Sequence, residues 1–113
     1  MLGGCYFMKY YGFPPLIDHK SRVLVLGTMP GKKSLEKQQY YADPRNKFWD
    51  IMFSILKKQD VSEYTKKTKI LLESGIALWD VLASCQRVNS GDNNITHLKA
   101  NDFARASFLN TNQ

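Results

Sequence analysis

The feature that most constrains the fold is an apolar run that ends in a turn. Residues 23–26 read Val-Leu-Val-Leu and are followed by Gly27. A continuous run of β-branched and leucine residues predicts a strand buried on both faces, as in the centre of a parallel sheet. The next residues, Thr28-Met29-Pro30-Gly31, predict a loop, because proline fixes φ and lacks an amide donor while the flanking glycines permit positive φ. Since ligands of open α/β sheets bind at the carboxyl ends of strands, this loop is a candidate binding site.

Apolar spacing and end signals predict the other elements. Apolar residues from Phe48 to Leu56 recur at helical spacing, and the helix they predict ends at Lys57-Lys58, where cations suit the helix dipole. Ser34 is expected to cap one helix and Asn101 another, and Gly75 closes the helix before a second buried strand. In chain order we expect a strand at 23–27, helices at 35–40, 46–58 and 62–74, a strand at 76–82, a loop at 84–94 and a helix at 102–109.

This order of elements is that of an α/β layered fold, with helices on both faces of a parallel sheet. A chain of 113 residues allows one domain. Two strands are few for a sheet, since sheets usually have about four to six. We therefore expect residues 9–113 to be the N-terminal two-thirds of a single domain whose C-terminal part is missing. Residues 1–8 are expected to be an N-terminal extension, with Met8 as an alternative start.

Composition excludes several classes of protein. No apolar stretch approaches the roughly 18 residues of a membrane span, and an aromatic content of 12% argues against disorder. Cys5 and Cys85 lie far apart without metal-ligand spacing, which predicts no metal site and no disulfide scaffold and fits a reducing, cytoplasmic location. The net charge is +6, and residues 20–69 hold 12 Lys or Arg against 5 Asp or Glu. That excess favours a polyanion such as nucleic acid as partner, with ordinary surface charge as the alternative.

Four short segments, taken together and in order, carry a family resemblance. They are Gly-Thr-Met-Pro-Gly at 27–31, Gln-Tyr-Tyr-Ala at 39–42, Pro-Arg-Asn-Lys-Phe-Trp at 44–49 and Leu-Trp-Asp-Val-Leu-Ala-Ser-Cys at 78–85. This combination resembles the uracil-DNA glycosylase superfamily, and most closely its deoxyinosine (hypoxanthine) DNA glycosylase branch. The resemblance covers about residues 8–110. The G-x-x-P-G loop is weakly specific alone, but its combination with Y-Y-A-x-P-x-N-x-F-W is specific.

The resemblance implies a uracil-DNA glycosylase-like α/β domain that acts on DNA containing a deaminated base. The implied enzyme is a monofunctional hydrolase that flips out hypoxanthine, or uracil, and cleaves its N-glycosidic bond without metal or cofactor. It also implies a monomer. A Pro-Ser loop that the superfamily carries near its C-terminus is not found here. The alternatives are a catalytically impaired DNA-binding fragment and an unrelated α/β nucleotide-binding protein, although the loop lacks the G-x-x-x-x-G-K-[ST] pattern of the latter.

The resemblance assigns roles to three residues, each of which has a structural alternative. Asn46 is expected to be catalytic by holding a water and contacting the nucleotide; the alternative is a cap of the following helix, and both roles can coexist. Tyr41 is expected to stack on the extruded base, with a core tyrosine as the alternative. Asp80 is expected to read the base edge by accepting the N1–H of hypoxanthine or the N3–H of uracil. Its alternative is to cap the following loop.

The remaining candidate residues surround these three. Relatives often carry a polar residue at the third loop position to hold the attacking water, and since Met29 cannot do so, that role falls to Asn46. Phe48 and Trp49 are expected to pack in the core because they lie on the apolar stripe of their helix. The loop expected to bring backbone close to the flipped nucleotide consists of Gly27, Thr28, Met29, Pro30 and Gly31. The cations expected to neutralise DNA phosphates are Lys32, Lys33, Arg45 and Lys47.

Overall fold

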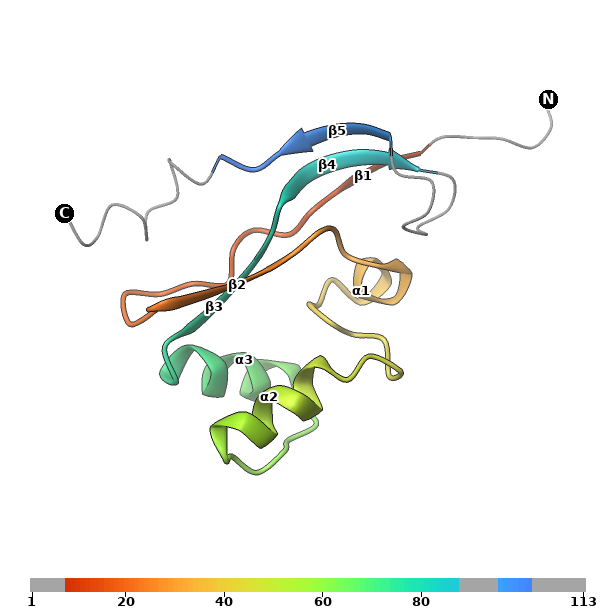
Figure 1. The fold of residues 1–113 in the computed structure, drawn as a ribbon. Coiled ribbons are helices and arrows are strands. Elements are labelled where there is room, and N and C mark those ends of the chain that lie inside the picture. The colour runs from red at the N-terminus through yellow and green to blue at the C-terminus, as the bar shows by residue number, and fades with distance from the viewer. Residues whose placement is uncertain (1–7, 88–95, 103–113) are drawn as a thin grey trace.

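The computed structural model describes residues 8–87 and 96–102. In this part of the chain, helices pack below a small parallel sheet, and an antiparallel sheet extends above it (Figure 1). No helix in the described ranges is long and apolar enough to cross a membrane. The elements, in chain order, are β1 (Met8–Tyr11), β2 (Val23–Gly27), α1 (Lys32–Lys37), α2 (Phe48–Leu56), α3 (Tyr64–Glu73), β3 (Ile76–Asp80), β4 (Leu82–Arg87) and β5 (Thr96–Ala100).

The parallel pair β2–β3 was expected, and the structure confirms it. The register pairs Val23 with Ile76 and Gly27 with Asp80, so both strands end at the same edge. The side chains of Val25 and Leu78 belong to the cluster that the helices cover. On the way into the strand, Gly75 has a φ of 82°, as its place after α3 predicts.

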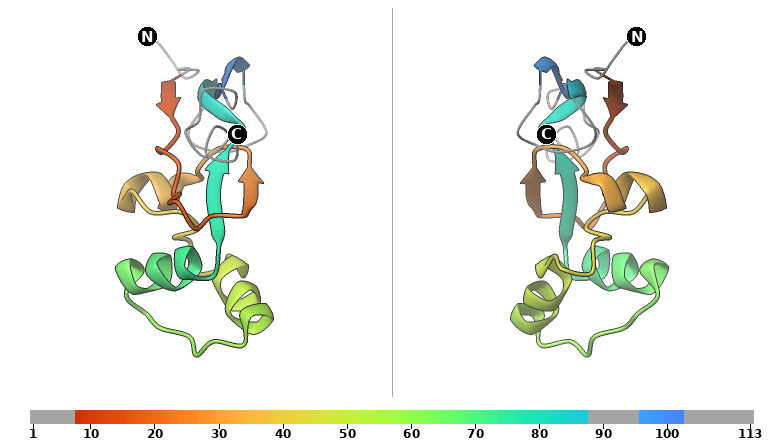
Figure 2. Two further views of the ribbon diagram at one scale, coloured as in Figure 1. Left: turned by 90° about the vertical axis from the view of Figure 1, so that its left-hand side faces the viewer. Right: turned by 90° about the vertical axis from the view of Figure 1, so that its right-hand side faces the viewer.

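The prediction that β2 is buried on both faces is wrong for the described part of the chain. Val23 is 56% exposed and Leu26 is 49% exposed. The reason is that β2 pairs with β3 on one edge and with no described strand on the other. Figure 2 shows β2 and α2 on one side of β3 and α3 on the other side, so this open edge lies above α2.

The expected loop at 84–94 is also wrong over its first part, because residues 82–87 form β4. The second buried strand therefore stops at Asp80, two residues earlier than expected, and the chain enters the second sheet after Val81. This sheet is antiparallel, with β4 between β1 and β5. Ser84 and Cys85 are buried in it although their sequence context reads as a loop, since neighbours on both edges satisfy the backbone of β4.

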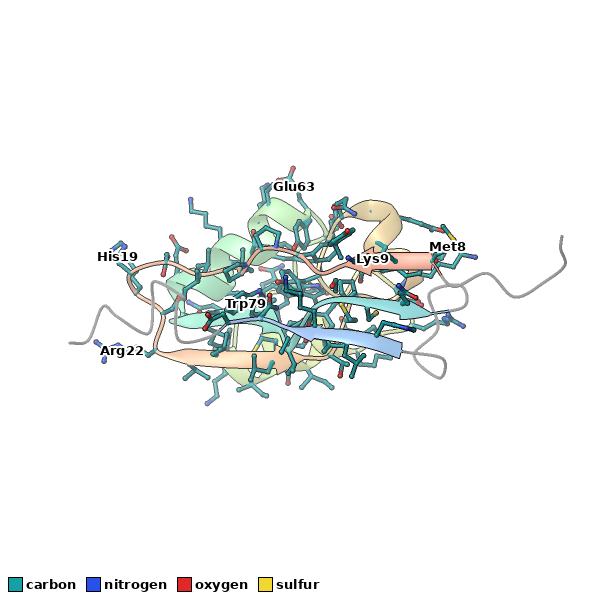
Figure 3. The ribbon with its side chains drawn as sticks, turned by 90° about the horizontal axis from the view of Figure 1, so that it is seen from above. Met8, Lys9, His19, Arg22, Glu63 and Trp79 are labelled. Carbon is teal, nitrogen blue, oxygen red and sulfur yellow. The ribbon has the colours of Figure 1, made fainter. Side chains whose placement is uncertain are left out.

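The second sheet makes the described part of the chain long. Viewed from above, Met8 and Lys9 of β1 lie at one end, and His19 and Arg22 lie at the other, before β2 (Figure 3). Trp79 lies between them, on the face of β3 opposite to Leu78, and is 9% exposed. The helix expected at 102–109 falls outside the described residues, apart from its first residue.

Helix α1 differs from its prediction, whereas α2 and α3 lie close to theirs. Helix α1 spans 32–37 rather than 35–40. The predicted cap by Ser34 is wrong, because no side chain caps α1. The Ser34 hydroxyl instead accepts a hydrogen bond of 3.1 Å from the backbone amide of Ala42. A residue read as a helix signal thus anchors the segment that follows the helix.

Side-chain hydrogen bonds hold the segment around Tyr40 against the helices. The Trp49 indole of α2 donates to the Tyr40 carbonyl at 3.1 Å, and the Tyr40 amide donates to the Tyr64 hydroxyl of α3 at 3.0 Å. The Tyr40 hydroxyl donates to the Pro14 carbonyl at 2.9 Å. Trp49 is buried as expected, and Tyr40 is 6% exposed. These contacts fix the backbone that leads into the candidate site.

Replacing Tyr64 with phenylalanine should test this anchoring. Tyr64→Phe keeps the ring but removes the acceptor of the Tyr40 amide, and an unsatisfied buried amide costs about 1–3 kcal/mol of stability. Urea unfolding monitored by circular dichroism would measure the loss. Tyr11→Phe, at a residue that is 63% exposed, is the control and should leave the midpoint unchanged. Equal midpoints for the two variants would contradict the anchoring.

Candidate active site

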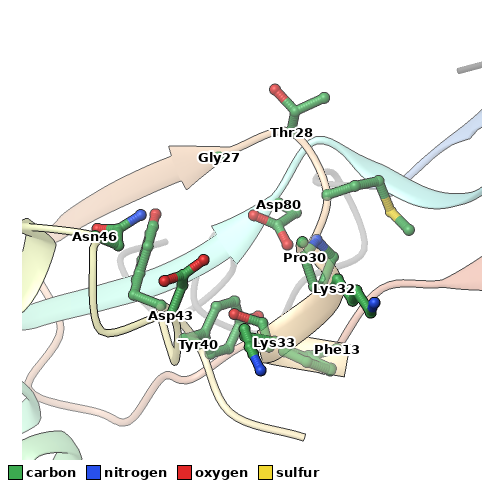
Figure 4. A pocket seen from close by; sticks show the side chains of 14 residues that line it. Phe13, Gly27, Thr28, Pro30, Lys32, Lys33, Tyr40, Asp43, Asn46 and Asp80 are labelled. Atoms are coloured by element: carbon green, nitrogen blue, oxygen red, sulfur yellow. The ribbon is translucent and has the colours of Figure 1, made fainter. Parts of the chain in front are cut away.

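A cavity opens where β2 and β3 end, in the place that the strand-end rule predicts. Its volume is about 310 Å³. Figure 4 shows side chains from the loop after β2, from the segment before α2 and from the end of β3 around it. The candidate residues that the structure brings together in its lining are Gly27, Thr28, Met29, Pro30, Gly31, Lys32, Lys33, Tyr41, Asn46 and Asp80.

Asp80 is the most unusual group in this cavity. It is 5% exposed, and its Oδ2 is buried without a hydrogen-bond partner. Burial raises the pKa of the carboxyl from its ordinary value near 4 to about 6. No described residue donates to the carboxylate, so the alternative of a loop cap is not what the structure shows; instead Asn101 donates to the Asp80 carbonyl at 2.7 Å. A buried carboxyl with a raised pKa in the lining of a cavity is a candidate functional group.

Gly27 makes room for this carboxylate. Because Gly27 and Asp80 are paired across the parallel strands, a side chain at 27 would point at its neighbour. A Cβ built there would lie 2.5 Å from Asp80 Oδ1 and 3.4 Å from the Tyr41 hydroxyl oxygen. The glycine is therefore required by close approach of the two polar groups.

Tyr41 lies beside Asp80 in a strained backbone conformation. Its φ is 55°, which is uncommon for a residue with a bulky side chain. Its ring stacks on Phe48 with a centroid distance of 3.9 Å and an interplanar angle of 16°. Burial, and then the negative charge of Asp80, raise the pKa of the Tyr41 hydroxyl. The ring is thus held at the cavity wall as a neutral phenol.

The two polar atoms of the Asn46 side chain lie in different surroundings. Its Oδ1 accepts a hydrogen bond of 2.8 Å from the backbone amide of Phe48, in the first turn of α2. Asn46 thus holds the first residue of α2 from the position before the N-cap, Lys47, which itself makes no side-chain cap hydrogen bond. Because an amide donor requires the oxygen as acceptor, the carboxamide nitrogen is left for the cavity, and Figure 4 shows it on that side.

The side chain of Met29 packs against the antiparallel sheet. It is 8% exposed and packs with Leu82 and Cys85 of the antiparallel sheet. Backbone carbonyls of the loop are used as well: Val81 donates to Gly27 at 2.8 Å, and Leu82 donates to Thr28 at 3.2 Å. The loop is pinned to the start of β4 and offers mainly backbone to the cavity.

Three of the four cations expected to bind phosphate have carboxylate neighbours. Arg45 binds Asp43 through two hydrogen bonds of 2.9 and 3.2 Å, and this contact lowers the pKa of Asp43 to about 2. Lys33 lies 3.9 Å from Glu36, and Lys47 lies 4.0 Å from Asp50. Such exposed pairs are weak. Lys32 and Lys33 line the cavity, whereas Arg45 and Lys47 do not.

Four residues of the cavity lining were not assigned to the site by sequence reasoning, namely Phe13, Ser34, Tyr40 and Asp43. Phe13 is 9% exposed and meets Tyr40 edge to face at 5.1 Å. It lies in a segment that carries no periodic signal, next to Pro14-Pro15. Asp43 could have been noticed from its place in the motif that contains Tyr41 and Asn46. In the described part of the chain, no three His, Cys, Asp or Glu side chains gather in a way that could hold a metal ion.

Comparison with known proteins gives the family of this chain. Residues 14–112 match the family described as Uracil DNA glycosylase superfamily, and the chain belongs to this superfamily. The interpretation as an unrelated nucleotide-binding protein is therefore wrong. The expected resemblance to the hypoxanthine branch is confirmed by relatives that carry that name.

Two of these relatives are named Hypoxanthine DNA glycosylase. The one from Methanosarcina barkeri (strain Fusaro / DSM 804) is 38% identical over 98 residues, which are 86% of this chain and 62% of the relative. The one from Methanosarcina acetivorans is 39% identical over 95 residues, 82% of this chain and 60% of the relative. A solution NMR structure of a Methanosarcina acetivorans protein has a TM-score of 0.76 at 38% identity, covering 86% of this chain and 61% of that chain. The chain thus spans about three fifths of the length of these relatives.

The pKa of Asp80 predicts how stability depends on pH. The folded protein keeps this proton up to about pH 6, whereas an exposed Asp releases it near pH 3.9. The folded state therefore binds more protons than the unfolded chain between about pH 4 and 6, and stability falls as the pH rises through this window. Asp80→Asn should remove that fall and be more stable than the wild type above about pH 6.

Melting curves recorded from pH 4 to 8 would measure this difference. Asp50→Asn removes an exposed carboxylate and serves as the control, which should follow the wild type. A parallel pH dependence for Asp80→Asn and the wild type would mean that Asp80 ionises in the fold as it does in the unfolded chain.

Proposed function

We propose that this chain carries the base-binding site of a DNA glycosylase that removes a deaminated base, with hypoxanthine as the first substrate to test. The observation that supports it most is the Asp80 carboxylate, buried and without a hydrogen-bond partner in a cavity that also holds Tyr41 and Asn46. The cavity of about 310 Å³ lies at the small end of ligand pockets, about 300–1,000 Å³. This size suits one base, and membership in the superfamily supports a base as ligand.

The chemistry of Asp80 favours a deaminated base over its parent. Hypoxanthine carries an N1–H donor where its parent adenine has a bare acceptor nitrogen, and uracil carries an N3–H donor where its parent cytosine has one. An ionised carboxylate accepts from the donor and repels the lone pair of adenine N1. Since the pKa of Asp80 is about 6, the group is mostly ionised at neutral pH. The same carboxylate reads hypoxanthine and uracil, so preference between them depends on the rest of the lining.

A base can reach this cavity only after leaving the helical stack. Stacking on the ring of Tyr41 would offset part of that cost, by about 1–3 kcal/mol in comparable sites. Lys32 and Lys33 border the cavity and would neutralise the phosphates beside the extruded nucleotide. DNA affinity should then weaken as salt is raised.

Hydrolysis breaks the bond between base and sugar, places the water oxygen on C1′ and leaves the water's proton for the departing base. Negative charge develops on the base as this bond breaks, and a fixed donor facing it stabilises the transition state. Asn46 supplies such a donor through its carboxamide nitrogen, because its oxygen is bound to the Phe48 amide. No cofactor is required for these steps.

A second candidate is DNA binding without excision. The observation that favours it is that Met29, at the loop position where the family resemblance implies a polar residue that holds water, is buried against Leu82 and Cys85. Such a protein would keep the cavity and the basic residues. It would bind an inosine-containing oligonucleotide with salt-dependent affinity but release no base.

Variants at Asn46 test the proposed reaction. Asn46→Asp keeps the oxygen that accepts from the Phe48 amide but loses the nitrogen donor, whereas Asn46→Ala loses both. Single-turnover excision from an inosine-containing oligonucleotide should fall about 10²–10³-fold in both variants. Only Asn46→Ala should also lose about 1 kcal/mol of stability, as a missing helix cap does.

Comparing substrates, and comparing excision with stability, distinguishes the proposed reaction from its alternatives. Oligonucleotides containing adenosine or uracil in place of inosine show whether the base edge is read as proposed. Wild-type excision by Asn46→Asp would contradict the donor role, and binding without release of hypoxanthine by the wild type would favour the second candidate.

A further inference from the structure

Phe48 contacts both the stacking and the catalytic candidates of the cavity, although it does not line the cavity itself. Its ring lies on the Tyr41 ring, 3.9 Å between centroids. Its backbone amide holds the Asn46 oxygen at 2.8 Å. The ring contact was not expected, since the place of Phe48 on the apolar stripe of α2 predicts only packing in the core.

The ring contact determines which face of Tyr41 is available. A ring has two faces, and Phe48 covers one of them at a nearly parallel angle of 16°. Tyr41 lines the cavity and Phe48 does not, so Tyr41 lies between Phe48 and the cavity. An extruded base would therefore stack on the opposite face of Tyr41, continuing a stack that Phe48 begins.

The same residue limits the motion of both partners. Tyr41 has a positive φ, a conformation that persists only where surrounding contacts impose it. Phe48 also meets Trp49 edge to face at 5.1 Å, and Trp49 is 5% exposed and hydrogen-bonded to the Tyr40 carbonyl. Phe48 is thus supported from the core and transmits that support to the two site residues.

We propose that Phe48 is a positioning residue of the active site, which fixes the Tyr41 ring with its own ring and the Asn46 carboxamide with its amide. The proposal rests on the proposed function for its effect on excision, but its structural part concerns the free protein. Removing the ring should let Tyr41 move without removing any group that touches the base. Misplacement by about 1 Å can cost roughly 100-fold in rate.

The test compares one substitution at two places on α2. Phe48→Leu removes the ring that backs Tyr41, and Phe53→Leu removes a ring that stacks on Trp49 at 6.0 Å instead. Single-turnover excision from an inosine-containing oligonucleotide should fall about 10- to 100-fold in Phe48→Leu, at a temperature where the variant is folded. Phe53→Leu should lower the melting temperature but keep its rate per folded molecule, and Phe48→Tyr, which retains the ring, should keep the wild-type rate.

Nuclear magnetic resonance of the free chain supplies a readout that does not require excision. Tyr41 ring protons should lose the upfield shift caused by Phe48, and the Asn46 side-chain NH₂ signals should move, in Phe48→Leu but not in Phe53→Leu. Phe48→Met, whose flexible side chain fills the same space, replaces Phe48→Leu if that variant does not fold. Unchanged Tyr41 and Asn46 signals would overturn the proposal. If the wild type excises nothing, the proposed function fails while these signals still decide the positioning role.

Discussion

The packing of the helices and of the segment before α2 depends on three hydrogen bonds of Tyr40. Its carbonyl is bound by a side chain of α2, its amide by a side chain of α3, and its hydroxyl by the carbonyl of Pro14. Tyr40 and several residues that follow it line the cavity, and the Ser34 hydroxyl holds the amide of Ala42 in this segment. Helix packing and site geometry are thus one set of constraints. A loop that would otherwise be free is fixed to the core at several atoms.

Several features of the cavity lower the stability of the folded protein. Asp80 and Tyr41 are both held away from water, and burial raises the pKa of each. The backbone at Tyr41 is strained, and a carboxylate oxygen lacks a partner. Unsatisfied buried groups cost free energy in a resting protein. Their occurrence together at the edge of the parallel sheet is what distinguishes a prepared binding site from an ordinary gap between loops.

Sequence reasoning predicted the strand, the turn and the helix around the cavity because it relied on local signals that tertiary structure rarely overrides. The apolar run at 23–26, the turn at 28–31 and the helical spacing from Phe48 onward all concern neighbours in sequence, and each appears where expected. They bring Tyr41, Asn46 and Asp80 to one cavity.

The wrong predictions concern residues whose structure depends on contacts with residues far away in the sequence. The polar residues of β4 read as a loop until β1 and β5 flank them. Ser34 looks like a cap until the backbone of Ala42 approaches it, and Phe13 gives no local sign that it will meet Tyr40. Likewise, an apolar run does not reveal which strands will lie beside it. Exposed Val23 and Leu26 show that burial depends on neighbours that composition alone cannot count.

The buried side chain of Met29 limits the sequence changes that are accessible to this loop. Because its side chain packs with Leu82 and Cys85 of the antiparallel sheet, a polar substitution at 29 would both open a gap there and bury a group without a partner. A polar residue could be accommodated at 29 only if the side chains packed against this position changed as well. Position 29 and the residues packed on it are therefore expected to change together or not at all.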